Sequence, residues 1–468
     1  MPSTALVWFR RDFRLHDNPA LVAALHDADR VVAVYLHAPD EEAPWQPGAA
    51  SNWWRHHSLA ALATAIAERG GRLTLRRGDS LAMLRELIRE TGAQSVHWNR
   101  LYEPAIRARD EQIKAALKAD GIIARSHNSA LLFEPWSLKT QADQPYRVFS
   151  PFWRNGEPQL VNARTPEPLP NGDWAGHGLD SLPLDALGLL PTIAWDAAFA
   201  DHWTPGESGA LERLDAFVDD AVNQYRATRD LPAVPGTSGL SPHLHFGEIS
   251  PQQALAAIKA RGPVSGQAAH FIRELGWREF AHHLLYHFPQ TPEQALYSDR
   301  FGRFPWRRPD DYADDLRAWQ RGQTGIPIVD AGMRQLWATG WMHNRVRMIV
   351  ASLLTKHLLI PWQAGAHWFW DTLVDASLAS NTLGWQWAAG CGADAAPYFR
   401  VFNPQLQSEK FDADGAYLKR WVPEVRALPP KAMHAPWTAS SPPPGYAPIV
   451  DLKAGRERAL AAYATLKE

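Results

Sequence analysis

Cysteine is nearly absent from this sequence, because its 468 residues contain only Cys391. A single cysteine excludes an intrachain disulfide and any zinc site built on cysteines. It also indicates a reducing compartment, and we expect the cytoplasm. Long apolar runs are missing too, since stretches such as 348–354 are far too short to cross a bilayer. We expect no signal peptide, because Arg10, Arg11 and Asp12 follow one short apolar run.

Several catalytic motifs are also absent. The first expected strand is not followed by Gly-x-Gly-x-x-Gly, so a dinucleotide site of that type is not supported there. The histidines are scattered, and none has the spacing of a metal site. No nucleophile elbow and no phosphate-binding P-loop occur. The usual hydrolase and kinase chemistries are therefore unsupported.

The chain has no excess of positive charge, since its net charge is −2. Binding to nucleic acid would therefore require a local basic face. Composition alone favours ordinary solvated surface charges. The candidates for a basic face are Arg300, Arg303, Arg307, Arg308, Arg345, Arg347, Arg400 and Lys410.

Apolar runs that alternate with helical periodicity predict a parallel sheet covered by helices in the first part of the chain. We expect strands at 5–9, 31–36, 73–75 and 95–98, and helices that start near Pro19 and at 52–69, 81–90 and 107–119. Proline and glycine then accumulate, which predicts a long surface connector, and helical periodicity returns afterwards. The expected organisation is an α/β (Rossmann-like) domain at 1–131, a connector at 132–206 and an all-α domain at 207–468.

The most informative stretch is 341–404, where tryptophans alternate with Asn, Arg and Asp. An indole needs a large packed slot, and its N–H needs a partner. Tryptophans among polar side chains therefore suggest stacking on a flat ligand or electron transfer. For any single tryptophan, a place in an aromatic-rich helical core is the more common outcome.

Two kinds of local pattern suggest binding sites. The hydroxyl-rich turn 237–242 precedes a helix that Ser241 could cap, and backbone N–H groups at such a start attract phosphate. A plain capped turn is the commoner case. Helical spacing also places polar and aromatic residues on common faces: Glu274 with Trp277 and Arg278, Asn344 with Met348, and Asn381 with Trp385.

Four separated motifs, in order, resemble the photolyase/cryptochrome flavoprotein family. The run Leu6–Asn18 (LVWFRRDFRLHDN) is similar to the N-terminal signature of that family. The runs 237–250, 341–348 and 384–404 are similar to its flavin-domain signatures. The resemblance covers nearly the whole chain and identifies it most closely with bacterial enzymes that repair cyclobutane pyrimidine dimers.

The resemblance implies FAD bound in a bent shape within the helical domain. Its diphosphate would be held by Tyr225, Thr237, Ser238, Leu240 and Ser241, and its rings by Arg278, Asn344, Arg347, Asp375 and Asn381. Arg347 and Asp375 match an ion pair beside the isoalloxazine, and Asn381 matches the residue that faces N5. The tryptophans Trp385, Trp362 and Trp306 match a chain that carries electrons from the surface to the flavin.

The resemblance also implies a reaction. Excited, fully reduced FAD would pass one electron to a cyclobutane pyrimidine dimer in DNA, the dimer would split, and the electron would return. The flipped-out dimer would lie against Glu274, Trp277, Asn344, Met348 and Trp387. Glu274 would hydrogen-bond its carbonyls in a dry pocket, and damaged pairs are easily extruded.

Other functions within the family remain open, namely a blue-light photoreceptor (cryptochrome) and an enzyme for the pyrimidine–pyrimidone photoproduct. Asn381, Asn344 and Met348 favour repair of cyclobutane dimers. Ser377 departs from the Asp usual in the family, which places one hydrogen bond near the flavin in doubt. Ala105 and Ile106 replace a polar pair that binds folate in some members. An antenna chromophore (methenyltetrahydrofolate or a deazaflavin) and its absence are both open alternatives, and we expect a monomer.

Overall fold

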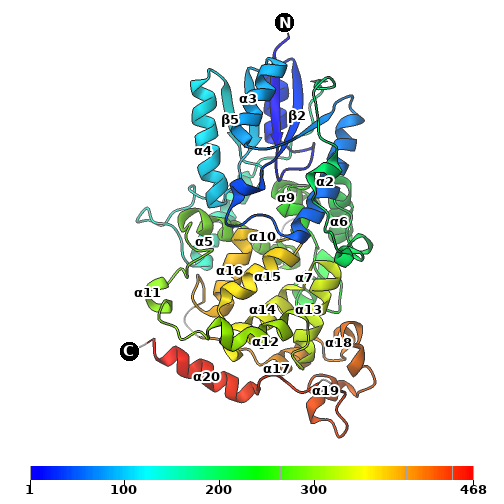
Figure 1. Ribbon diagram of the computed structural model, residues 1–468, viewed down its shortest axis with the longest axis vertical. Helices are drawn as coiled ribbons and strands as arrows, with labels where there is room; N and C mark the ends of the chain where they lie inside the picture. Colours follow the sequence, from blue (N-terminus) through cyan, green and yellow to red (C-terminus); the bar gives the residue numbers. More distant parts are fainter. Residues whose placement is uncertain (1, 263–265, 396–398, 445, 467–468) are drawn as a thin grey trace.

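The computed structural model describes residues 2–262, 266–395, 399–444 and 446–466. Ala396, Pro397 and Tyr398 of the expected 384–404 signature lie outside these described residues. The N-terminal part is a parallel α/β sandwich and the remainder is mainly helical, as expected (Figure 1). No helix within the described ranges is long and apolar enough to cross a membrane.

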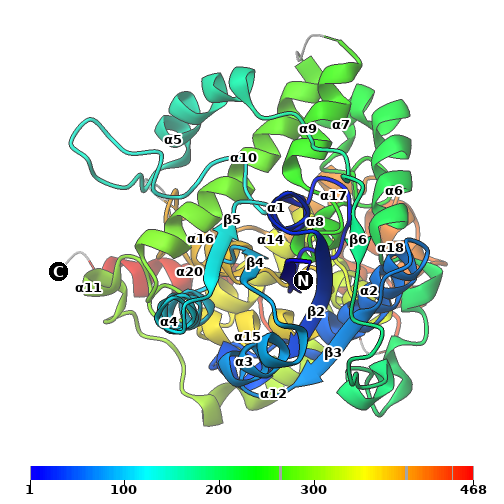
Figure 2. The same cartoon turned by 90° about the horizontal axis from the view of Figure 1, so that it is seen from above.

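The sheet has the strand order β3-β2-β1-β4-β5, and every pair is parallel (Figure 2). Its strands are β1 (Thr4–Phe9), β2 (Arg30–His37), β3 (Leu73–Arg77), β4 (Ser95–Asn99) and β5 (Ile123–His127). The two-residue strand β6 (Asp173–Trp174) pairs with β2. The order reverses between β1 and β4, and in such sheets ligands bind beyond the carboxyl ends of the strands at this point.

Helices cover both faces of the sheet because the strands are apolar on both sides. They are α1 (Pro19–Asp27), α2 (Ala49–Ala67), α3 (Ser80–Thr91) and α4 (Pro104–Ala119). Leu6 and Trp8 of β1 belong to one core with Leu84 of α3, and Val7 belongs to the opposite core with Trp54 of α2. Four of the five main strands agree with the expected positions, and β5 was not anticipated.

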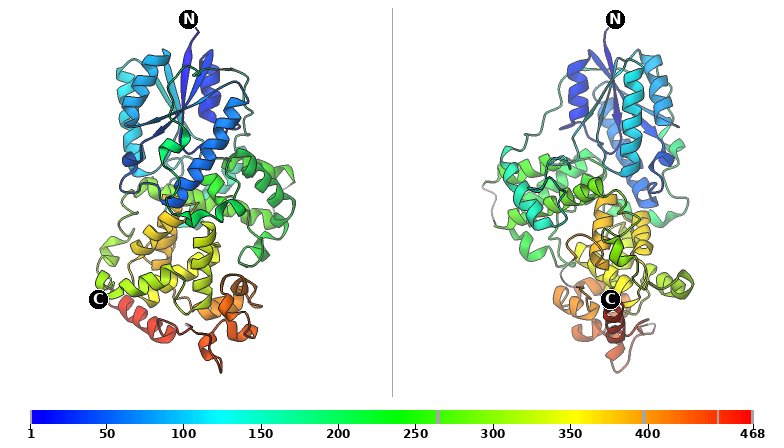
Figure 3. Two further views of the ribbon diagram at one scale, coloured as in Figure 1. Left: turned by 45° about the vertical axis from the view of Figure 1, so that its right-hand side comes forward. Right: turned by 90° about the vertical axis from the view of Figure 1, so that its left-hand side faces the viewer.

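The helical part contains the helices from α6 onward (Figure 3). They are α6 (Glu207–Asp219), α7 (Tyr225–Thr228), α8 (Ser241–His245), α9 (Pro251–Ala260), α10 (Gly266–His287), α11 (Ser298–Phe301), α12 (Pro309–Gln320), α13 (Pro327–Thr339), α14 (Asn344–Ser352), α15 (Trp362–Thr372), α16 (Leu378–Ala389), α17 (Pro404–Phe411), α18 (Ala416–Trp421), α19 (Pro430–Met433) and α20 (Leu452–Ala464). A π-helical turn, Leu353–His357, continues α14.

The segment expected to be an irregular connector contains a helix that the sequence interpretation missed, α5 (Phe149–Gly156). Its residues Phe149, Phe152 and Trp153 are buried in the same core as Phe280 of α10. Their spacing of three and four residues is typical of one helical face. The surrounding prolines and glycines obscured this signal, so the segment is partly core and not only surface.

Two buried polar clusters join the sheet to the helical part. The guanidinium of Arg14 donates to the carbonyl oxygen of Gly247 at 2.8 Å and to Ser129 Oγ at 2.6 Å. The carboxylate of Glu248 accepts from Trp54, at 2.9 Å from Nε1, and from the Gly206 backbone N–H at 2.7 Å. These bonds hold the start of α9 and the end of α8 against the sheet domain.

Gly247 allows this close approach. Its φ is +62°, and a Cβ placed on it would lie 2.3 Å from the carbonyl oxygen of Arg11. Any other residue would therefore need both a left-handed backbone and a displaced neighbouring chain. The turn between α8 and α9 thus fixes the hydroxyl-rich segment before α8 relative to the ends of the strands.

Candidate functional site

A cavity of about 1030 Å³ lies where the sheet domain meets α8, α10, α14 and α16. This volume includes space that is open to solvent. The lining contains three arginines and three carboxylates, so a charged ligand would find partners of either sign. The lining residues are Arg11, Leu101, Tyr102, Glu103, Ala130, Tyr225, Ser238, Ser241, Leu244, His245, Phe271, Glu274, Leu275, Arg278, His282, Arg347, Asp375, Ser377 and Ser380.

Asp375 is the central carboxylate of this cavity. It accepts two hydrogen bonds from Arg347 Nη2, at 3.1 and 2.8 Å, and one from Ser241 Oγ at 2.6 Å. Arg347 also donates from Nε to the carbonyl oxygen of Met342 at 2.7 Å. The ion pair expected between Arg347 and Asp375 is therefore present, and it is tied to the hydroxyl-rich segment. Its position beside a flavin stays a prediction.

The hydroxyl-rich segment is arranged differently from the expectation. Leu240 is the N-cap residue, Ser241 is the first residue of α8, and no side chain caps the helix. Ser241 is already the first helical residue, and its Oγ donates to Asp375 and accepts from Trp341 Nε1 at 3.4 Å. Ser238 lines the cavity, whereas Thr237 is half-buried and outside the lining, and Leu240 is 1% exposed. The segment therefore offers two hydroxyls to the cavity, from Ser238 and Ser241.

Arg278 extends from α10 towards the connection between the domains. Its guanidinium donates to the carbonyl oxygens of Ala130, at 2.6 Å, and Leu244, at 3.3 Å. It lines the cavity, as does Tyr225 of α7. The structure thus brings together six of the predicted cofactor residues: Tyr225, Ser238, Ser241, Arg278, Arg347 and Asp375.

Two further predicted cofactor residues lie beside the cavity lining and not within it. Asn381 is half-buried on α16, and its Nδ2 donates to the carbonyl oxygen of Ala366 at 3.0 Å. Its neighbours Ser377 and Ser380 do line the cavity. Asn344 is exposed at the start of α14. Contacts of Asn381 and Asn344 with a cofactor stay predictions.

Only some of the predicted substrate residues line the main cavity. Glu274 lines the cavity and forms an ion pair with Arg229. Trp277 stacks on Phe149 with ring centroids 3.7 Å apart, so one face of its indole is covered. Asn344 Nδ2 lies 3.9 Å from Met348 Sδ on the same helix.

Trp387 borders a separate small cavity of about 290 Å³. The guanidinium of Arg400 is 5.6 Å from the centroid of its ring. Trp387 is half-buried, and it does not line the main cavity. Its contact with a substrate stays a prediction.

The three tryptophans expected to carry electrons belong to one aromatic region. Trp385 and Trp362 are each 2% exposed, and Trp306 is half-buried and packs against the same core. A Cβ on Gly365 would lie 2.0 Å from the ring of Trp385, so α15 and α16 approach closely there. Trp385 also meets Phe369 with centroids 5.0 Å apart. Burial thus decreases from Trp385 towards Trp306, which suits a path to the surface.

The predicted basic face is partly neutralised by neighbouring carboxylates. Arg307 pairs with Asp315 at 2.7 Å, and Arg345 pairs with Asp230 at 2.9 Å. Lys410 lies over the ring of Phe411, with its Nζ 5.1 Å from the centroid. These contacts agree with the alternative that many of these cations are ordinary surface charges.

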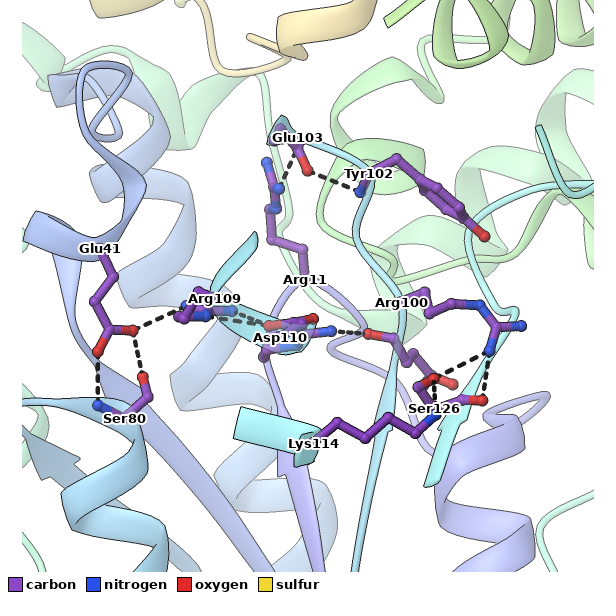
Figure 4. Close-up of polar contacts among 12 residues, drawn as sticks. Arg11, Glu41, Ser80, Arg100, Tyr102, Glu103, Arg109, Asp110, Lys114 and Ser126 are labelled. Atoms are coloured by element: carbon purple, nitrogen blue, oxygen red, sulfur yellow. Dashed lines mark hydrogen bonds and ion pairs between the residues drawn. The ribbon is translucent and has the colours of Figure 1, made fainter. Parts of the chain in front are cut away.

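The sheet domain supplies a part of the cavity wall that the sequence interpretation missed. Arg11 follows β1, and its Nη2 lies 2.6 Å from Oε1 of Glu103, which follows β4 (Figure 4). The backbone N–H of Tyr102 donates to the same carboxylate at 3.2 Å. The available signal was topological, because the ends of parallel strands meet at one edge where the strand order reverses.

Two histidines of the helical part, His245 of α8 and His282 of α10, also line the cavity and add no charge to it. Burial, reinforced by the positive charge of Arg278, lowers the pKa of His282 to about 4. Burial also lowers the pKa of His245 well below its ordinary value. Both imidazoles are therefore neutral near pH 7, and the positive charges of the cavity come from Arg11, Arg278 and Arg347.

Glu279 gives a prediction about pH. It is 3% exposed and accepts from the backbone N–H groups of Leu132 and Phe133, and burial raises its pKa from 4.5 to about 7. A folded-state pKa above the unfolded one means that the folded protein binds more protons between these values, so stability falls as pH rises from about 4.5 to about 7. We expect Glu279 to remove about 3 kcal/mol of unfolding free energy across this window.

Urea denaturation of wild type and Glu279→Gln at several pH values would measure this effect. The wild type should lose stability relative to the variant as the pH rises. The exposed Glu111 of α4 provides a matched control, Glu111→Gln, which should follow the wild type. A constant difference between wild type and Glu279→Gln over the window would contradict the prediction.

Comparison with known proteins agrees with this geometry. Residues 5–171 match the family model described as DNA photolyase, and residues 271–465 match the model described as FAD binding domain of DNA photolyase. The chain is 49% identical over 476 residues to the deoxyribodipyrimidine photo-lyase of Agrobacterium fabrum, covering 99% of this chain and 98% of the relative. It is 37% identical to cryptochrome-1 of Arabidopsis thaliana, covering 93% of this chain and 65% of the relative.

A solved structure shows the same similarity in three dimensions. The crystal structure of a bacterial class III photolyase from Agrobacterium tumefaciens superposes with a TM-score of 0.94 at 48% sequence identity. The match covers 100% of this chain and 98% of that one.

Proposed function

This chain belongs to the photolyase/cryptochrome family of flavoproteins, and we propose that it repairs cyclobutane pyrimidine dimers in DNA in a light-dependent reaction. The observation that carries this proposal is the cavity in which Arg347, Asp375 and Ser241 are linked beside Glu274. Full-length similarity to a deoxyribodipyrimidine photo-lyase supports the same reaction.

FAD fits the cavity by the chemistry of its lining. Ser238, Ser241 and Arg278 present hydroxyl and guanidinium donors, which suit a diphosphate. The Arg347–Asp375 pair supplies a donor and an acceptor in fixed positions, which suit the edge of a flavin ring. When it is bound and reduced, FAD supplies the excited electron that splits the dimer.

The residues of the chain bind the dimer and stabilise its added charge. Glu274 would hydrogen-bond to the dimer within a cavity from which the bound ligands exclude water, and such preorganised contacts act most strongly on developing charge. Asn344 and Met348 would contact the extruded bases from α14, and Trp277 and Trp387 would stack against them. Trp385, Trp362 and Trp306 would carry electrons inward from the surface.

The identity of an antenna chromophore belongs to this proposal. A second cavity, of about 490 Å³, is lined by Trp45, Pro104 and Ala105 of the sheet domain and by Pro292 and Trp370 of the helical part. Its lining also includes the charged residues Arg11, Glu42, Glu103 and Glu293. Aromatic walls with charged groups beside them suit a flat ring system with polar substituents, such as methenyltetrahydrofolate or a deazaflavin. An antenna would be supported by a second absorption band from a chromophore that denaturant releases separately from FAD.

A monomer in the cytoplasm completes the proposal. The cytoplasm is supported by the single cysteine, because a chain with one thiol has no intrachain disulfide to maintain. Cys391 is buried, and burial raises the pKa of its thiol to about 12. A thiol of this kind remains protonated and unreactive.

Domain boundaries near residues 131 and 206 are proposed from the composition of the sequence.

Repair of a defined lesion tests the function. An oligonucleotide with one cyclobutane thymine dimer is incubated with the reduced holoprotein in blue light and in darkness, and recovery of thymine absorbance is followed. We expect light-dependent recovery, lowered about 100-fold in Glu274→Ala because one charge-stabilising contact is lost. Asn381→Ala should also lose repair, and the exposed surface variant Glu111→Ala should keep it.

The possible outcomes separate the functions that the family contains. No recovery from a protein that binds FAD and photoreduces would favour a photoreceptor. Recovery only with the pyrimidine–pyrimidone photoproduct would favour the other repair reaction. Repair at the wild-type rate by Glu274→Ala would show that Glu274 does not take part in the reaction.

A further inference from the structure

Two consecutive residues of opposite charge, Arg229 and Asp230, reach two different helices of the cavity wall. Arg229 forms an ion pair with Glu274 of α10. Oδ2 of Asp230 lies 2.9 Å from Nη2 of Arg345 on α14. Glu274 lines the cavity, and Arg347, two residues after Arg345, lines it as well. The Arg229–Asp230 turn therefore bridges α10 and α14 at one edge of the cavity.

The bridge lies at the solvent-facing edge. The side chains of Arg229 and Glu274 are 19% and 31% exposed, and those of Asp230 and Arg345 are 34% and 18% exposed. Side chains with this exposure can be reached by a ligand in the cavity or by DNA. Each cation could therefore exchange its carboxylate for another anion.

Arg345 has a second contact that does not depend on Asp230. Its guanidinium carbon lies 4.4 Å from the centroid of the Phe411 ring. Loss of Asp230 would therefore leave the guanidinium held beside Asn344 with its positive charge free. A phosphate is the natural partner for such a group.

The two ion pairs are coupled because Arg229 and Asp230 are adjacent on one turn. A ligand that bonds to Glu274 competes with Arg229 for that carboxylate. Displacement of Arg229 together with the turn would move Asp230 and release Arg345. Occupation of the cavity is thereby linked to the availability of a cation at its edge.

From this arrangement we propose that Asp230 is a specificity-determining residue that prevents Arg345 from binding a DNA phosphate until a dimer occupies Glu274. The inference rests on the proposed function, since it assigns the ligand of Glu274 to the dimer. On undamaged DNA both ion pairs stay closed, and the edge of the cavity is electrically neutral. On damaged DNA the extruded dimer opens the bridge, and Arg345 adds one phosphate contact.

Salt dependence of binding measures this contact directly. Each neutralised phosphate changes the slope of log K against log salt by about −0.9. For the wild-type holoprotein in darkness, we expect the slope for a duplex with one thymine dimer to be steeper by about 0.9 than the slope for the undamaged duplex. Asp230→Asn should steepen the slope for undamaged DNA to the same value and leave the slope for damaged DNA unchanged.

The affinity for DNA should change in the same direction as the salt dependence of binding. Asp230→Asn should bind undamaged duplex more tightly than wild type at low salt, with an advantage that shrinks about 3-fold between about 50 mM and about 200 mM salt. The preference for damaged DNA should fall accordingly. The double variant Asp230→Asn/Arg345→Gln should lose the advantage, because the released cation is gone.

Controls separate the failure modes. Asp215 of α6 is exposed and forms no ion pair within the part of the chain that the structure describes, so Asp215→Asn should behave like wild type. Asp230→Ser provides a second way to remove the carboxylate, and FAD content verifies folding. A wild type without preference for the dimer duplex would defeat the proposed function. A wild-type preference that Asp230→Asn leaves unchanged, or equal loss of affinity for both duplexes, would overturn the role of Asp230.

Discussion

Replacement of Asp375 by alanine is expected to give a folded protein that purifies without FAD. Asp375 accepts from both Arg347 and Ser241, and its side chain is 4% exposed. Removal leaves Arg347 without its anion inside the cavity and frees Ser241 from its fixed position. Contacts of FAD that depend on this cluster are lost with it, and we expect at least about 100-fold weaker binding, which corresponds to about 2.8 kcal/mol.

The ratio of flavin to protein absorbance after gel filtration measures this result, followed by titration of the apoprotein with FAD. Asp371→Ala is a matched control, because Asp371 is exposed and its Oδ1 accepts from the Ala49 backbone N–H at 2.8 Å. It should retain the flavin. Wild-type FAD content in Asp375→Ala, with an unchanged circular dichroism spectrum, would show that this cluster does not hold the cofactor.

The largest loss of stability is expected from Glu248→Ala. Glu248 is fully buried and accepts from four donors, which belong to Trp54, Ser58, Gly206 and His243. Alanine would leave all four donors without this acceptor in a site that water does not reach. Each unsatisfied buried group costs about 1–3 kcal/mol. We therefore expect the unfolding free energy to fall by at least about 4 kcal/mol.

Urea denaturation of the holoprotein measures that loss. Glu248→Gln retains one acceptor oxygen and should lose less than Glu248→Ala. Glu212→Ala replaces an exposed glutamate on the neighbouring α6 and should stay close to wild type. A loss below about 1 kcal/mol in Glu248→Ala would mean that the surrounding groups find other partners on relaxation.

The fold was largely predictable because its strongest signals are local. Strands such as Thr4–Phe9 are continuous apolar runs, which parallel sheets buried on both faces require. The strand that escaped prediction, Ile123–His127, lies at the sheet edge, and Ile123 at its start is 50% exposed. Such a strand needs no apolar run. The helix Phe149–Gly156 escaped because neighbouring prolines and glycines masked three apolar residues.

The candidate site was predictable where the family motifs lie and not where distant segments meet. Arg347, Asp375 and Ser241 were identified by resemblance, and the structure brings them together. The contribution of Arg11 and Glu103 depends on which strands become neighbours, which no local pattern encodes. The pairing of Arg229 with Glu274 is likewise a tertiary contact.

The bonds of Arg14 also bear on how the protein is made. This side chain near the N-terminus donates to the carbonyl of Gly247, 233 residues further along the chain. Domains generally begin to fold in order as they leave the ribosome. The sheet can therefore form early, but Arg14 remains without this acceptor until the turn at Gly247 has emerged. Closure of the cofactor cavity waits longer still, because Asp375 is synthesised after both, so FAD can enter its complete site only late in translation or after release.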